Sequence, residues 1–315
     1  MPATEILRPA PYGPSVTLPA PHPEGADFPL SLARTPTQPG APLADVLAEI
    51  QNLAASGRIR SLLDHHGAIY FQGLGLESPH DFSEFAHAFG WVAHEDIGNP
   101  VRRTVLAKNV ATANEGPNTQ PVYPHNEFGL SPHYPAYVMF YCGVKYQLFH
   151  PNGPRDQTSS AGTTVLQAYG LHVLDTDDVE TAREKIENEI RRLPTATWQW
   201  ENQSQSNALG DLRVWNVLPA VRDHPRTGKP SFFNNVVSRH LNALQNDTLE
   251  PPHINKEGKY QPPCFYGDGS PIPREYLDSA VEFINQTRSL VSWTAGDVIL
   301  LDNHAVQHAR EPWTG

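Results

Sequence analysis

Three histidines each stand two positions before an acidic residue, a spacing that could bind a metal. They are His22-Pro-Glu24, His94-Glu-Asp96 and His125-Asn-Glu127. In an extended segment, residues i and i+2 point the same way, so both side chains of such a pair can reach one ion. Two imidazoles and one carboxylate on one face of an ion form the usual site of non-haem Fe(II) oxygenases. Three pairs are close to the number that chance gives for 15 histidines and 34 acidic residues, so their surroundings must decide.

The surroundings favour the third pair. His22 lies in a proline-rich stretch, and His94 follows a predicted helix and leads into a loop. His125 lies shortly before the apolar run 137–142, which is typical of a buried strand. A solvated histidine beside an acid is the alternative for any such pair. We predict His125 and Glu127 as metal ligands.

The third ligand is expected near the C-terminal end of the sequence. Ala295-Gly-Asp297 is a turn signal, 298–302 is an apolar strand, and polar residues ending in His308 follow it. A barrel strand that delivers a ligand to the barrel mouth would have this pattern. His304 is the rival in the same stretch, and a structural histidine at the strand end is the alternative for both. We predict His308.

The elements that must position these residues alternate between helices and strands. Periodic apolar residues predict helices over 43–53, 59–63, 78–89, 177–192 and within 273–290. Apolar or β-branched runs predict strands at 68–72, 137–142, 214–218, 231–237 and 298–302. Residues 1–41 are proline-rich and predict an extended arm lying on the body. We expect residues 42–315 to form a single domain.

Composition excludes several classes of protein. The net charge of −11 argues against a nucleic-acid partner, because phosphate binding needs a basic face. The N-terminus lacks the apolar run of a signal peptide, and no stretch is long enough to span a membrane. Two cysteines, Cys142 and Cys264, make no disulfide framework. We therefore expect a cytoplasmic protein with a small-molecule substrate; a homo-oligomer is compatible with the sequence.

Beyond these patterns, the sequence resembles the taurine dioxygenase and clavaminate synthase-like family of oxygenases. The resemblance begins near residue 27 and is carried by the order of several motifs. They are 66–74, 114–116, His125-Asn-Glu127, Gly162, 232–234, Trp293, Gly296-Asp297, Asp302-Asn303, His308 and Arg310.

The resemblance implies a mainly β fold with helices (α+β), a double-stranded β-helix or jelly-roll barrel flanked by helices. It also implies Fe(II), held by His125, Glu127 and His308, with 2-oxoglutarate as co-substrate and O2. The implied reaction is oxidation of an unactivated C–H bond of a small polar metabolite, such as an amino acid. Hydroxylation, desaturation and ring formation are its outcomes, with release of succinate and CO2.

The sequence departs from the family pattern at two places. The family has a threonine that contacts 2-oxoglutarate in a segment that should follow Val144, and an arginine for its far carboxylate beyond Gly315. We expect that residues are missing between Val144 and Lys145 and after Gly315. The carboxylate ligand is Glu127, where the family more often has aspartate. A carboxylate at this position argues against a halogenase.

Substrate contacts are expected at four residues: His94, Phe128, Phe232 and Asn234. Ordinary packing or a loop hydrogen bond is the alternative explanation for each of them. Two other functions also remain open. One is a cupin-like metal-dependent enzyme that does not use 2-oxoglutarate, and the other is a non-catalytic small-molecule binding protein on the same fold.

Overall fold

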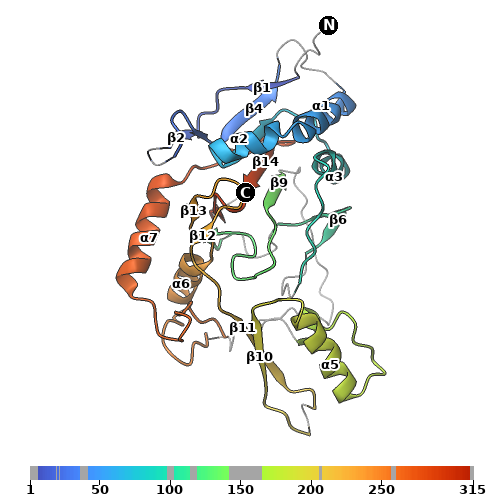
Figure 1. The fold of residues 1–315 in the computed structure, drawn as a ribbon, viewed down its shortest axis with the longest axis vertical. Coiled ribbons are helices and arrows are strands. Elements are labelled where there is room, and N and C mark those ends of the chain that lie inside the picture. Colours follow the sequence, from blue (N-terminus) through green and yellow to red (C-terminus); the bar gives the residue numbers. More distant parts are fainter. Residues whose placement is uncertain are drawn as a thin grey trace.

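The computed structural model describes residues 6–18, 20, 22–35, 42–97, 103–113, 119–141, 165–205, 208–256 and 260–312. The structure is a mixture of helices and strands, as the sequence predicted (Figure 1). The predicted junction between Val144 and Lys145 lies outside the described residues.

A five-stranded sheet forms the centre of the fold, with the strand order β1-β4-β5-β14-β9. Its strands are β1 (Leu7–Pro9), β4 (Leu30–Arg34), β5 (Ala68–Gln72), β14 (Val298–Asp302) and β9 (Tyr137–Tyr141). The β4–β5 pair is parallel and the other three pairs are antiparallel. The bounds of β5 and β14 agree with those expected from the sequence, because both are short apolar runs between turn signals.

Both faces of this sheet are covered. Along β14, Val298 and Leu300 belong to one apolar cluster, whereas Ile299 and Leu301 belong to another, as the two-residue period of a strand requires. The helices α1 (Leu43–Ala55), α2 (Arg58–His66) and α3 (Pro79–Ala88) contribute buried residues to the first cluster. β14 is therefore buried from end to end.

The N-terminal segment does not behave as a simple arm. β4 is an interior strand that pairs with β1 on one side and with β5 on the other. Leu30 and Leu32 are buried in the main apolar cluster. This part of residues 1–41 is thus built into the sheet, where the sequence had predicted an extended segment lying on the body. Two short strands, β2 (Val16–Thr17) and β3 (Asp27–Phe28), form a separate hairpin in the same segment.

In a separate two-stranded sheet, β8 (Val122–His125) pairs antiparallel with β15 (His308–Arg310). Helix α6 (Val236–Gln245) packs on β8. The predicted strand over 231–237 is wrong: only β13 (Pro230–Ser231), which pairs with β12 (Arg222–Asp223), is extended there. Asn234 ends the extended stretch, since its side chain accepts a hydrogen bond from the Val236 amide and starts a turn.

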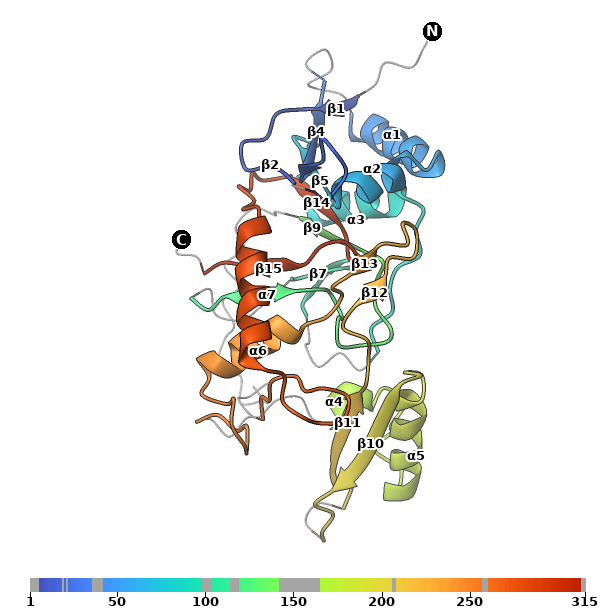
Figure 2. The ribbon, with the colours of Figure 1, turned by 60° about the vertical axis from the view of Figure 1, so that its left-hand side comes forward.

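A further unit is built from two helices and a β-hairpin. A hairpin of β10 (Ala196–Glu201) and β11 (Asp211–Asn216) carries α5 (Val179–Ile190), with α4 (Val165–Tyr169) beside it. Both views place this unit at the end of the molecule opposite to α1 and β1 (Figures 1 and 2). The remaining elements are β6 (Val105–Ala107), β7 (Val110–Ala111) and α7 (Arg274–Thr287).

Within the described ranges, no helix is long and apolar enough to cross a membrane.

The buried strand β14 should carry much of the stability of the fold. Leu300 is fully buried, so we expect Leu300→Ala to lower the free energy of unfolding by about 2–5 kcal/mol through lost burial and a cavity. Urea unfolding followed by circular dichroism measures this change. The exposed Leu174 is the matched control, and Leu174→Ala should stay within about 0.5 kcal/mol of the wild type. Equal effects of the two substitutions would contradict the assigned core.

Candidate metal centre

The β8–β15 pair brings three donor side chains to one point. His308 lies directly opposite His125 in the strand register, and their ring centroids are 4.3 Å apart. Glu127 follows two positions after His125 and places its Oε2 atom 3.2 Å from His308 Nε2 and 3.9 Å from His125 Nε2. One donor atom from each residue lies within 4.8 Å of the other two. The group is of a size that one metal ion can bridge, and its two nitrogens and one oxygen suit Fe(II).

The His125 ring is oriented for coordination through Nε2. Its Nδ1 lies 2.7 Å from the carbonyl oxygen of Tyr123, and because a carbonyl can only accept, Nδ1–H is the donor. Nε2 is then left with a lone pair that faces Glu127. Burial, assisted by the nearby His308, lowers the pKa of His125 to about 4. The ring is therefore neutral near pH 7, which is the form that binds a metal.

Glu127 is the anionic member of the group. Burial of Glu127 opposes its ionisation, but the hydrogen bond and charge of His308, with Arg103 and His125, outweigh it and lower the pKa of its carboxyl to about 2. The carboxylate is therefore ionised across the physiological pH range. Its other oxygen, Oε1, lies 3.1 Å from a guanidinium nitrogen of Arg103.

The backbone at Glu127 is fixed by the side-chain amide of Asn303. Asn303 Oδ1 accepts a hydrogen bond from the Glu127 amide at 2.8 Å, and Asn303 Nδ2 donates to the Glu127 carbonyl at 2.9 Å. The same nitrogen donates to the Pro135 carbonyl at 2.8 Å. Asn303, which lies near the start of the segment that carries His308, thus fixes the backbone of Glu127.

Asn126, the residue between the two ligands, completes this connection from the opposite face. It is 1% exposed, and its Nδ2 donates to the carbonyl oxygens of Asn303 at 2.7 Å and Val306 at 3.0 Å. Its Oδ1 accepts from the Asn234 amide at 3.0 Å. We had not singled out Asn126 from the sequence. The available signal was that a residue between two ligands spaced two positions apart points to the opposite face, where a buried polar side chain must find internal partners.

Of the four predicted substrate contacts, His94 and Phe128 lie together beside the candidate centre. The His94 ring meets the Phe128 ring edge to face at 5.1 Å and stacks on His133 at 4.5 Å. His94 Nε2 is buried without a hydrogen-bond partner in the described structure. Phe128 follows Glu127 with a positive φ of 56°, a conformation that is uncommon for a bulky residue. This strained turn directs the chain sharply away after the carboxylate ligand.

The other two predicted substrate contacts lie in different surroundings. Phe232 is 44% exposed and belongs to neither apolar cluster of the sheet. Asn234 is buried, and its side chain donates to the Ala220 carbonyl and accepts from the Val236 amide. Both the nitrogen and the oxygen of its side-chain amide are thus hydrogen-bonded to the backbone, and its role as a substrate contact stays a prediction.

The rival ligand His304 is buried on another side of the strand segment. Its ring lies 5.1 Å from that of Phe233 and 5.3 Å from that of Tyr134, and it is not part of the group formed by His125, Glu127 and His308. His304 therefore packs within an aromatic cluster, and it is His308 that faces Glu127.

Two other groups of donor atoms in the described part of the chain are already paired internally. In the group of Asp64, His224 and Asp302, His224 Nε2 lies 3.0 Å from Asp302 Oδ2, and Asp64 forms a bidentate pair with Arg226. The exposed group of His80, Asp81 and Glu84 includes the carboxylate that caps α3.

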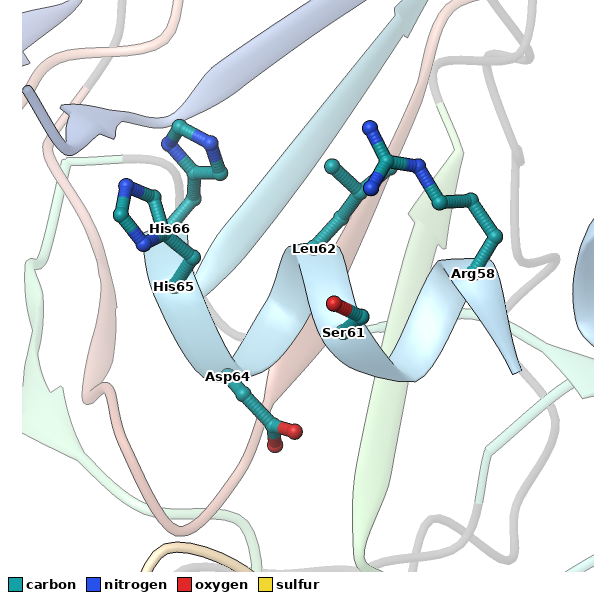
Figure 3. A pocket seen from close by; sticks show the side chains of 6 residues that line it. All are labelled: Arg58, Ser61, Leu62, Asp64, His65 and His66. Atoms are coloured by element: carbon teal, nitrogen blue, oxygen red, sulfur yellow. The ribbon is translucent and has the colours of Figure 1, made fainter.

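A shallow cavity on α2 is lined by residues of that helix alone, and the ligand group is not part of it. Figure 3 shows the side chains that line it: Arg58, Ser61, Leu62, Asp64, His65 and His66.

Comparisons with known proteins place the chain in a family. The family model described as taurine catabolism dioxygenase TauD, TfdA family matches residues 32–315, and the chain belongs to this family. The expected resemblance is thus confirmed.

Two relatives are similar in sequence over most of their length. A clavaminate synthase-like protein of Arabidopsis thaliana is 25% identical over 80% of each chain. The dapdiamide synthesis protein DdaC of Enterobacter agglomerans is 24% identical over 85% of each chain. The crystal structure of the PvcB protein from Pseudomonas aeruginosa aligns with a TM-score of 0.41 and 16% identity, covering 97% of this chain and 88% of that one.

The low pKa of His125 couples its protonation to unfolding of the metal-free protein. The pKa is about 4 when folded, against an ordinary value of 6.5, so the unfolded chain binds more protons between these values. The contribution of this site to stability is complete above pH 6.5 and is lost as the pH falls toward 4, by at most about 3 kcal/mol.

We therefore expect the His125→Gln variant to lose less stability than the wild type between about pH 7 and about pH 4.5. Urea unfolding in the presence of a chelator measures the difference. His172→Gln, at an exposed position, should retain the wild-type dependence. An unchanged slope in His125→Gln would show that His125 is not held neutral by burial.

Proposed function

We propose that this protein is an Fe(II)- and 2-oxoglutarate-dependent oxygenase that holds its iron with His125, Glu127 and His308. The observation that carries the proposal is the convergence of one donor atom each from His125, Glu127 and His308 within 4.8 Å of one another. Membership of the TauD, TfdA family supports the same chemistry. With Fe(II), 2-oxoglutarate and O2 bound, such a centre supplies the oxidising power to break an unactivated C–H bond, with release of succinate and CO2.

The chain's own residues would perform three tasks in this reaction. His125 is held neutral with its Nε2 lone pair toward the centre, and Glu127 supplies the negative charge. The three donors come from one side, β15 and the end of β8, which leaves the opposite side for the co-substrate and O2. Phe128 and His94 form an aromatic wall beside Glu127 that would exclude water and orient the substrate.

We also propose that the five-stranded sheet and the β8–β15 pair are the two sheets of a double-stranded β-helix. The antiparallel pairing of β9 with β14 and of β8 with β15 supports this arrangement. β8 leads to β9, and β14 leads to β15, so each of these chain segments would pass from one sheet to the other. Such a barrel would place the ligands at its open mouth.

The proposed substrate is a small polar metabolite, an amino acid or a derivative of one. The name of the relative that takes part in dapdiamide synthesis supports a role in small-molecule synthesis. The wall of His94, Phe128 and His133 offers aromatic surface together with an imidazole nitrogen that has no hydrogen-bond partner in the described structure. A substrate with one polar group next to an aliphatic carbon would suit this surface.

Anaerobic absorption spectroscopy of the full-length protein tests the iron site. Fe(II) together with 2-oxoglutarate should produce a visible charge-transfer band, because the keto acid chelates the iron. Glu127→Ala and His308→Ala should each abolish the band and reduce succinate formation to background, since each removes one of three ligands. His80→Ala is the matched control, since His80 lies 3.9 Å from an acidic side chain but is exposed. Its band should match the wild type.

The outcomes separate the proposal from its alternatives. A wild-type protein that binds Fe(II) but gives neither the band nor succinate would indicate a metalloenzyme that does not use 2-oxoglutarate. A protein that binds no metal would indicate a non-catalytic binding protein. Bands of wild-type intensity in both ligand variants would show that the iron binds elsewhere.

A further inference from the structure

The carboxylate of Glu127 is held from two sides, and only one side belongs to the candidate ligand group. Oε2 faces the two imidazoles, at 3.2 Å from His308 and 3.9 Å from His125. Oε1 receives a hydrogen bond from a terminal nitrogen of Arg103 at 3.1 Å. The two oxygens therefore have different partners.

Arg103 is brought to this position by a hairpin that does not contribute any of the three ligands. The Thr104 amide donates to Thr112 Oγ1 at 3.1 Å, and the Thr112 amide donates to the Thr104 carbonyl at 3.0 Å, which closes the hairpin of β6 and β7. Ser83 Oγ of α3 donates to the Lys108 carbonyl at its turn, at 2.7 Å. Arg103 thus extends from a supported backbone, and its side chain is 32% exposed beside a carboxylate that is 15% exposed.

The chemistry of a glutamate ligand explains why such a contact matters. Glutamate has one more rotatable bond than aspartate, so its carboxylate is less well fixed by the backbone. A free carboxylate can bind an ion through one oxygen or through both. Binding through both would occupy a coordination position that the co-substrate or O2 needs. A group that occupies one oxygen would prevent this and would also reduce the loss of side-chain freedom on metal binding.

We propose that Arg103 is a positioning residue that holds Glu127 Oε1 and thereby restricts the carboxylate to coordination through Oε2 alone. This inference rests on the proposed iron site. Groups that orient a metal ligand from outside in this way commonly change metal affinity and geometry when they are removed. Arg103 would act through Glu127 and would not bind the metal.

A second arginine–glutamate pair offers a matched comparison. Arg213 binds Glu201 across the β10–β11 hairpin at 2.9 and 3.1 Å, and both side chains are more exposed than their counterparts Arg103 and Glu127. The geometry of this pair is at least as good, yet Glu201 belongs to no group of candidate ligands in the described structure. Removing Arg213 therefore reports the effect of losing a surface arginine, with its ion pair to Glu201 and its contact with the Tyr260 ring, away from the candidate ligands.

The test compares metal binding by the full-length wild type with Arg103→Met, Arg103→Lys and Arg213→Met. Titration with Co(II) gives both an affinity and a visible spectrum whose intensity depends on coordination number. We expect Arg103→Met to bind Co(II) roughly 10- to 100-fold more weakly and to absorb less per bound ion, because Glu127 can then bind through both oxygens. Arg103→Lys should recover part of the affinity, since it keeps the charge but not the planar fork. Arg213→Met should match the wild type.

Circular dichroism and thermal unfolding distinguish misfolding from a local effect. A wild-type affinity and spectrum in a folded Arg103→Met variant would overturn the positioning role and leave the iron site intact. Weaker binding in Arg103→Met and Arg213→Met alike would also overturn it, because the effect would then be general. Failure of the wild type itself to bind Co(II) or Fe(II) would instead overturn the proposed iron site, and the inference with it.

Discussion

The register between β8 and β15 is the constraint on which the candidate centre depends. It places His308 opposite His125, and the buried amides of Asn126 and Asn303 tie the two chain segments together around Glu127. A slip of one residue would turn His308 to the other face of its strand, away from His125 and Glu127. The amide network makes such a slip costly, because it would leave buried polar atoms without partners. Register, network and donor geometry are therefore parts of one arrangement.

Electrostatics prepares this arrangement for a cation. Burial keeps the His125 ring neutral, while the surrounding positive groups keep Glu127 ionised. A buried carboxylate without a partner would be unfavourable, and in the metal-free protein His308 and Arg103 provide that partner. Binding of a divalent ion would replace the contact with His308 but need not displace Arg103, which faces the other oxygen. His308 and Arg103 thus hold the carboxylate from both of its oxygens.

The sequence predicted the parts of the protein that follow local rules. Short apolar runs between turn signals located β5 and β14, and the capping sequence at Ser78 located the start of α3. The start of α6 at Val236 was missed, since the adjacent β-branched residues in the predicted strand 231–237 suggested an extended chain, and only the side chain of Asn234 shows why the chain turns. The role of β4 inside the sheet was missed because parallel pairing with β5 is a long-range property.

For the candidate metal centre, His125, Glu127 and His308 could be proposed from spacing and resemblance. Arg103 could not, since no local pattern links it to Glu127. The binding of Fe(II) by these three residues stays a prediction.

The central claim is that one iron ion binds between His125, Glu127 and His308. A crystal of the full-length protein, soaked anaerobically with Fe(II) and measured on both sides of the iron absorption edge, tests this most directly. The account predicts one anomalous peak within coordination distance of both Nε2 atoms and of Glu127 Oε2. A peak between Asp64, His224 and Asp302, a second donor group of the described structure, or no peak beside Glu127 at full iron loading, would contradict it.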